Sequence, residues 1–165
     1  MEEKKNNIEN SYLTFKIGDE IYASHVNSVL NIIELPTITR VPHSPYYMKG
    51  IMNLRGMVLP VVNTKLKLGM HETESTNKTS IVVMDIRIDE EVVHIGMLVD
   101  EVNEVLVIDD SQIKPPPSIG STYKSAFITG IVDIDNKMIM IIDVVKVFSE
   151  QELVELSETN ETAEA

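Results

Sequence analysis

Apolar and polar side chains alternate along much of this chain in short runs. From Leu13 to Ile17 every second residue is apolar, and the same period of two returns from Val82 to Ile88, which is the pattern of a strand with one buried face. Predicted strands cover residues 13–17, 21–23, 48–54, 57–63, 82–88, 92–99, 105–108, 130–134 and 137–142. About ten short strands at hairpin-like spacing, with little helix, indicate an all-β protein built from small barrels or curled sheets.

One of the predicted hairpins occurs twice in the sequence. Residues 50–63 align without a gap on residues 130–143, with a glycine, two apolar runs, a turn pair and a final Asn or Asp in step. A fainter match places residues 26–33 on residues 99–106. The chain therefore contains an internal repeat, which predicts two related lobes. Because five-stranded units this small cannot each bury a full core alone, the lobes should pack tightly and unfold together.

The turn of the first repeated hairpin is Arg55-Gly56. Gly56 can adopt the positive φ that a two-residue hairpin turn requires. Arg55 is unusual at such a position, and its long cationic side chain must either reach solvent or find a carboxylate or carbonyl partner. A solvated turn residue and a binding residue are both consistent with this pattern.

Polar segments suggest where the domain begins and ends. Residues 1–10 are charged and amide-rich and are predicted to be disordered. Residues 11–156 are predicted to form a single domain of two lobes, at approximately 11–70 and 81–148, with interleaved packing of the lobes left open. Residues 157–165 are predicted to form an acidic disordered tail.

Short helical segments are predicted where capping residues follow strands. Asn63 and Asp143 each end a predicted strand and can cap a following helical turn. Ser149 with Glu152 resembles a capping box, which predicts a further short helix. Residues 26–30 carry apolar positions three and four apart, a spacing compatible with one or two helical turns.

Composition narrows the class of protein. The chain has 165 residues, a formal net charge of −12 and no cysteine. The negative charge argues against nucleic acid and anionic membrane surfaces as partners, and the absence of cysteine fits a reducing cytoplasm. The N-terminus does not resemble a secretory signal, and the most apolar run, residues 138–147, is far shorter than the roughly 20 residues of a membrane helix. The sequence therefore predicts a soluble, cytoplasmic protein.

The sequence offers little catalytic chemistry. The four histidines show no metal-ligand spacing, and there is no phosphate-binding loop, dinucleotide fingerprint or nucleophile elbow. Asp133, Asp135 and Asp143 fall at a turn and a helix cap rather than in a metal site. We therefore predict a binding protein with no cofactor, no metal and no enzymatic activity. The competing interpretation is a small-ligand-binding sensory β-barrel, although the abundant Ile, Val and Met favour a barrel interior filled by side chains.

A set of motifs points to a known family. They are residues 12–15, 18–20, 48–56, 58–62, 98–102, 113–117 and 129–131. The most specific is Lys49-Gly50-Ile51-Met52-Asn53-Leu54-Arg55-Gly56. From about residue 12 to residue 148 the chain closely resembles the CheW family of bacterial chemotaxis coupling proteins, whose domain also occurs in the kinase CheA and in CheV. The resemblance implies two SH3-like five-stranded β-barrels packed around a shared hydrophobic core, with short helical segments.

The resemblance also implies a function. CheW-like proteins are non-catalytic adaptors that couple methyl-accepting chemoreceptors to the histidine kinase CheA. The implied partners are the regulatory domain of CheA and the cytoplasmic tip of the receptors, which recruit the protein to receptor arrays at the inner membrane without membrane insertion. Carried over by position, the receptor and kinase coupling region comprises Arg55, Gly50, Asn53, Gly56, Asn31, Val29 and Val102.

Two positions depart from the family pattern. Many members have a glutamate that pairs with the hairpin arginine, but this chain has Asn31 there, whereas its own second copy has Glu104. An amide supplies a hydrogen-bond acceptor without charge, so the ion pair with Arg55 cannot form at this position. Glu34 is an alternative partner. Asn63 replaces a common aspartate and should keep the helix-capping function.

Overall fold

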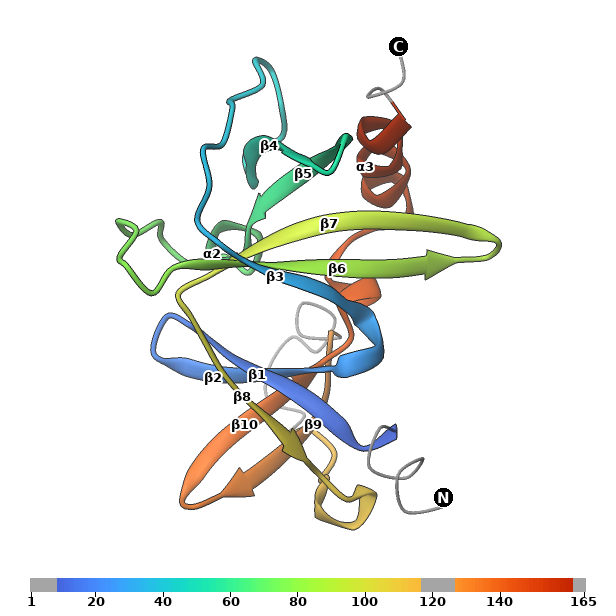
Figure 1. Ribbon diagram of the computed structural model, residues 1–165. Coiled ribbons are helices and arrows are strands. Elements are labelled where there is room, and N and C mark those ends of the chain that lie inside the picture. The colour runs from blue at the N-terminus through green and yellow to red at the C-terminus, as the bar shows by residue number, and fades with distance from the viewer. Residues whose placement is uncertain (1–8, 117–126, 162–165) are drawn as a thin grey trace.

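The computed structural model describes residues 9–116 and 127–161, and about half of them lie in two mainly antiparallel β-sheets of five strands each (Figure 1). Sheet I has the strand order β8-β1-β2-β10-β9. It contains β1 (Ser11–Ile17), β2 (Glu20–His25), β8 (Glu101–Val107), β9 (Ile128–Ile134) and β10 (Lys137–Ile142). Sheet II has the order β3-β6-β7-β5-β4. It contains β3 (Val29–Glu34), β4 (Met48–Leu54), β5 (Met57–Asn63), β6 (Ser80–Ile88) and β7 (Glu91–Val99).

The two sequence halves are interleaved in these sheets. The chain leaves sheet I after β2, builds all of sheet II from residues 29–99, and returns to sheet I at β8. Sheet I therefore combines residues 11–25 with residues 101–142. The sheets do not follow the sequence ranges 11–70 and 81–148, because each sheet takes two strands from one half and three from the other. Sheet I pairs β1 and β2 of the first half with β8, β9 and β10 of the second, and sheet II pairs β6 and β7 of the second half with β3, β4 and β5 of the first. The predicted all-β class is confirmed.

Strand pairing confirms the internal repeat. In the β4–β5 hairpin Gly50 pairs with Val61, and in the β9–β10 hairpin Gly130 pairs with Ile141. The second strand of each hairpin also pairs in parallel with a strand of another hairpin, β5 with β7 and β10 with β2. The repeat is therefore one of hydrogen-bonding pattern as well as of sequence.

The fainter repeat is confirmed in the same way. Ile32 in β3 pairs with Val82, and Val105, its counterpart in β8, pairs with Leu13. The β3–β6 pairing has a register shift between Val29 and Asn31, and the β8–β1 pairing has one at the equivalent place, between Phe15 and Leu13. Strands β3 and β8 are thus equivalent edge strands of the two sheets.

One apolar core joins the sheets. Its largest cluster takes Phe15 and Ile17 from sheet I, Met84 and Ile86 from sheet II, and Phe148 from the segment after β10. Each sheet also has a small cluster of its own, with Val132, Ile139 and Ile141 in sheet I at the repeat positions of Met52, Leu59 and Val61 in sheet II. Because the shared cluster is the largest, the two lobes should lose their stability together.

Short helical segments follow the strands. They are α2 (Thr64–Lys67), α3 (Glu150–Glu161) and the 3₁₀ turns η1 (Val26–Ser28), η2 (Asp110–Gln112) and η4 (Val144–Val147). Of these, α2, η4 and α3 begin at the capping residues that the sequence predicts. The Asn63 side chain accepts a hydrogen bond from Leu66 N at 3.3 Å, and Asp143 accepts one from Val145 N at 3.1 Å. Among the described residues, no helix has the length and apolar character needed to cross a membrane.

Some local predictions were wrong. Residues 157–161, expected in a disordered tail, continue helix α3, because Leu153 and Leu156 anchor it in the shared core. Only the first part of residues 26–30 is helical, since Val29 and Leu30 begin β3, where Val29 pairs with Met84 of β6. Asn10, expected to be disordered, accepts a backbone hydrogen bond from Ile108 at 2.8 Å. The remaining predictions for residues 1–8, 117–126 and 162–165 lie outside the described residues.

Candidate functional site

The β4–β5 turn has the geometry expected of a two-residue hairpin. Arg55 and Gly56 both have positive φ, 52° and 89°, which matches the right-handed twist of the flanking strands. The Asn53 side chain stabilises the turn by accepting a hydrogen bond from Gly56 N at 2.8 Å. In the second copy the same positions are Asp135 and Asn136, also at positive φ. Asp and Asn tolerate this conformation better than Arg, so Arg55 occupies its position at a local cost of about 1–2 kcal/mol.

The Arg55 side chain is exposed and reaches away from the turn into solvent. Within the part of the chain that the structure describes, its guanidinium makes no hydrogen bond or ion pair. The Asn31 side chain instead accepts a hydrogen bond from the adjacent Ile32 N at 2.8 Å. Glu34 does not pair with Arg55 either, so that alternative was wrong. The five donors of the guanidinium are therefore available to another molecule.

Gly50, at the base of this hairpin, allows the preceding chain segment to pass close against β4. The proline-rich connection crosses β4 there, with Thr39 N donating to Ile51 O at 2.9 Å and Ile51 N donating to Thr39 O at 2.8 Å. A Cβ on Gly50 would lie 2.3 Å from Thr39 O, so only glycine permits this crossing. Lys114 and Ile131 form the same bridge in the second copy. Gly50 therefore fixes the hairpin against the connection that precedes it.

The other predicted site residues are spread over both sheets. Val29 on β3 pairs with Met84, and Val102 on β8 occupies the equivalent place opposite Phe15. Both valines are half-buried and pack against the shared core. The structure thus gathers one group on the β4–β5 hairpin, namely Gly50, Asn53, Arg55 and Gly56, and leaves Val29 and Asn31 on β3 and Val102 on sheet I.

Sequence reasoning missed the exposed apolar residues of the equivalent edge strands β3 and β8. Leu30 and Ile32 on β3 are 52% and 44% exposed, and Val105 and Val107 on β8 are 56% and 58% exposed. Both segments carry apolar residues on both faces, which in a sequence looks like a buried strand. Only the strand order shows that they are edges, where apolar side chains and unpaired backbone groups suit the docking of another protein.

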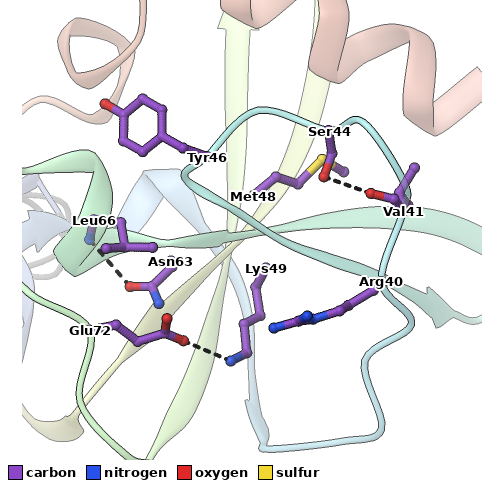
Figure 2. Close-up of a pocket in the computed structure, with 9 residues that line it drawn as sticks. All are labelled: Arg40, Val41, Ser44, Tyr46, Met48, Lys49, Asn63, Leu66 and Glu72. Carbon is purple, nitrogen blue, oxygen red and sulfur yellow. Dashed lines mark hydrogen bonds and ion pairs between the residues drawn. The ribbon is translucent and has the colours of Figure 1, made fainter.

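A small polar pocket lies beside the base of the β4–β5 hairpin. Figure 2 shows Arg40, Lys49 and Glu72 at this pocket of about 220 Å³. Lys49 Nζ pairs with Glu72 Oε1 at 3.0 Å, and Ser44 Oγ donates to Val41 O at 2.8 Å (Figure 2). The pocket lacks a nucleophile held by a base, so its chemistry is that of polar binding and not of catalysis.

Lys67 ties α2 to the start of α3. Its Nζ lies 3.0 and 2.9 Å from the two carboxylate oxygens of Glu152 and 4.8 Å from the centroid of the Tyr47 ring. Burial, reinforced by the charge of Glu152, raises the pKa of Tyr47. Burial also raises the pKa of Glu152, but hydrogen bonds from Ser149 and Lys67 and the charge of Lys67 together lower it below its ordinary value. These contacts are structural and leave no group poised for proton transfer.

Taken together, these features define a protein-binding module. Leu59, Val61 and Ile81 are fully buried and fill the space enclosed by sheet II. This filling argues against the alternative of a β-barrel that binds a small ligand in its interior. Among residues 9–116 and 127–161, no group of three or more acidic or histidine side chains could hold a metal ion. The exposed apolar edges and the unpaired Arg55 suit contact with another macromolecule.

Comparison with known proteins identifies the family. The CheW-like domain model matches residues 11–152, so the chain belongs to this family. The probable chemotaxis protein CheW of Rhizobium etli is 39% identical over 140 residues, which cover 85% of this chain and 88% of that protein. The chemotaxis protein CheW of Rhizobium meliloti is 34% identical with the same coverage.

A solved structure agrees with this assignment. The crystal structure of the scaffolding protein TtCheW from Thermoanaerobacter tengcongensis superposes with a TM-score of 0.72 and 32% sequence identity, covering 82% of this chain and 89% of that one. Sheets I and II are therefore the two SH3-like barrels of this family. CheW-like proteins are scaffold or adaptor proteins and not enzymes.

Proposed function

We propose that this protein is a chemotaxis adaptor that couples methyl-accepting chemoreceptors to the histidine kinase CheA. The cytoplasmic tip of a receptor contacts the region around Arg55, and the regulatory domain of CheA contacts another surface of the barrels. The protein reaches receptor arrays at the inner membrane through these partners. Its relatives from Rhizobium, described as chemotaxis proteins, support this role.

The observation that carries the proposal is the unsatisfied guanidinium of Arg55. Arg55 has a left-handed backbone conformation, which costs about 1–2 kcal/mol. Its side chain makes no hydrogen bond or ion pair with any described residue that could offset this cost. A residue held at a conformational cost without an internal partner is best explained by an external one. Arginine binds a carboxylate with two parallel hydrogen bonds and also binds the free carbonyls at a helix C-terminus. In this proposal one of these groups, on a receptor helix, is the partner of Arg55.

Val29, Asn31 and Val102 contribute less directly in this proposal. Val29 and Val102 support the edge strands from the core side, since both pack half-buried against the shared cluster. Asn31 leaves Arg55 free where a glutamate would neutralise it. A receptor carboxylate therefore meets an unpaired cation on this chain.

The kinase surface is assigned to the apolar barrel edges. The regulatory domain of CheA contains the same kind of domain, so barrel can pack on barrel in a pseudo-symmetric manner. Val105 and Val107 on β8 offer an apolar edge for such packing. A standard specific interface covers about 800 Å² on each partner, and two barrels have room for two such surfaces.

Binding measurements on a charge-reversal variant test the proposal. The wild type, Arg55→Glu and the control Arg87→Glu are titrated separately with a receptor tip fragment and with the CheA regulatory domain. Arg87 lies on β6 of the same sheet, its side chain is 78% exposed, and it forms a long ion pair of 3.8 Å with Asp85. Because so long a pair to an exposed arginine contributes little to stability, the control carries the same charge change at another place. We expect Arg55→Glu to weaken receptor binding by at least about tenfold, because a hydrogen bond to a charged group is worth about 1.5–3 kcal/mol.

Kinase binding should stay within about twofold in both variants, since a single exposed charge away from an interface contributes under about 0.5 kcal/mol. Receptor binding that survives Arg55→Glu unchanged would remove Arg55 from the receptor surface. Absence of saturable binding to either partner by the wild type would refute the adaptor role itself.

A further inference from the structure

The β6–β7 hairpin is longer than its repeat counterpart. Met84 pairs with Ile95 in this hairpin, and the equivalent pair in the β1–β2 hairpin is Phe15 with Tyr22. Ten residues lie between the first pair and six between the second. Two more residues on each strand lengthen the ribbon by about 7 Å. The second half of the chain therefore carries an extension that the first half lacks.

This extension forms one wall of a groove, and helix α3 forms the other. In Figure 1 the tip of the β6–β7 ribbon projects beyond the sheet, and α3 stands over the same ribbon. The groove has a volume of about 730 Å³. Its lining residues are Ile88, Asp89, Glu90, Glu91, Val93, Glu150, Leu153, Val154 and Ser157. Nine of the twelve residues of helix α3 lie beyond residue 152, where the match to the family domain ends.

The helix wall is held in place at both ends. At its start, Ser149 Oγ accepts a hydrogen bond from Glu152 N at 3.1 Å while Glu152 also pairs with Lys67. Near its end, the Asn160 side chain accepts from His94 N at 3.0 Å and donates to His94 O at 3.2 Å and to Val58 O at 2.9 Å. A groove with a fixed wall needs little ordering when a ligand binds, which favours affinity.

The groove is acidic at its rim and apolar on its floor. Asp89, Glu90, Glu91 and Glu150 contribute four carboxylates, and none of them forms an ion pair with any described residue. No lysine or arginine is among the lining residues. Ile88, Val93 and Leu153 supply the apolar floor, and Val154 on the helix is 55% exposed.

We propose that this groove binds a basic amphipathic segment of a partner protein. Lysine or arginine side chains of the segment pair with the four carboxylates, and its apolar side chains cover Ile88 and Val154. Charge complementarity selects this occupant, because an acidic or neutral segment would leave four carboxylates crowded without counter-charge. The Arg55 turn has the opposite sign, so the groove serves a different partner segment from the one that Arg55 binds.

A synthetic amphipathic peptide of lysine and leucine tests this surface on the full chain by calorimetric titration. The test variant is Glu90→Lys combined with Glu91→Lys. The matched control is Asp19→Lys combined with Glu20→Lys, which makes the same charge change at the exposed turn of the shorter β1–β2 hairpin. A second test variant, Val154→Ser, removes an apolar contact without changing charge. All substituted side chains are exposed, so folding is checked simply by comparing unfolding curves.

We expect one saturable site on the wild type, a loss of at least about tenfold in affinity for the Glu90 and Glu91 double variant, and less than about twofold for the control. Val154→Ser should weaken binding by about threefold or more, because apolar area is lost from the contact. Equal losses in the test and control double variants would mean that the peptide responds only to net charge, which overturns the proposal. Absence of saturable binding would overturn it as well. Neither result depends on receptor or kinase binding.

Discussion

Substitution of Gly50 by alanine should destabilise the protein strongly, although no side chain is lost. The new Cβ would lie 2.3 Å from Thr39 O, and a normal contact requires about 1 Å more. That shift breaks the two hydrogen bonds between Thr39 and Ile51, at about 1–3 kcal/mol in total. Gly50 also has φ of 154°, a sparsely populated backbone region in which alanine is strained by at least about 1 kcal/mol. The expected loss is about 2–4 kcal/mol, or roughly 5–15 °C in Tm.

Urea unfolding of Gly50→Ala and Gly130→Ala measures this effect with an internal control. Gly130 occupies the repeat position of Gly50, but its Cβ would meet the side chain of Ile113 at 2.5 Å and Lys114 O only at 3.4 Å. A side chain can move where a bridged backbone cannot, so Gly130→Ala should cost about 1–2 kcal/mol. The steric argument fails if Gly50→Ala loses less than about 1 kcal/mol, or if Gly130→Ala proves the more damaging substitution.

Two further predictions concern helix α3. Asn160→Ala removes three hydrogen bonds to β5 and β7 and should lower the free energy of unfolding by about 1–3 kcal/mol. It should also speed hydrogen exchange at the His94 amide, and an unchanged exchange rate there would contradict this prediction. The lowered pKa of Glu152 means that its stabilisation is fully present above the ordinary value of 4.5 and is lost as pH falls through the lower folded value. The stability difference between wild type and Glu152→Gln should therefore shrink on acidification, and a difference that stays constant between pH 6 and about pH 3 would refute this linkage.

Features that depend on neighbouring residues were predictable from the sequence. The Arg55-Gly56 turn, the caps at Asn63 and Asp143, and the alternating strands follow from local backbone and side-chain chemistry. The repeat also predicted two equivalent lobes, because similar sequence patterns form similar hydrogen-bonding patterns. Local rules therefore predict the individual strands, turns and caps, but not how the strands are ordered in the sheets.

Features that depend on distant partners were not predictable. Nothing in the local pattern of β3 or β8 shows that they are edges, since this depends on pairing with strands on the other half of the chain. The extent of α3 was missed for the same reason. Its last turns look like a polar tail, and they are held by Asn160, whose partners Val58 and His94 lie far away in sequence. The candidate site divides likewise, with the Arg55 hairpin predicted and the exposed edges Leu30, Ile32, Val105 and Val107 missed.

The interleaving of the two sheets also sets an order of events during synthesis. All strands of sheet II lie within residues 29–99, between the first two and the last three strands of sheet I in the sequence. The strands of sheet II are therefore all synthesised before β8, β9 and β10. At ribosomal rates of about 5–20 residues per second, β1 and β2 then wait roughly 2–9 s for their remaining partners. During that interval the apolar side chains of the β1–β2 hairpin, Phe15 and Ile17 among them, can already pack against the finished sheet II. The later barrel therefore assembles on a template provided by the earlier one.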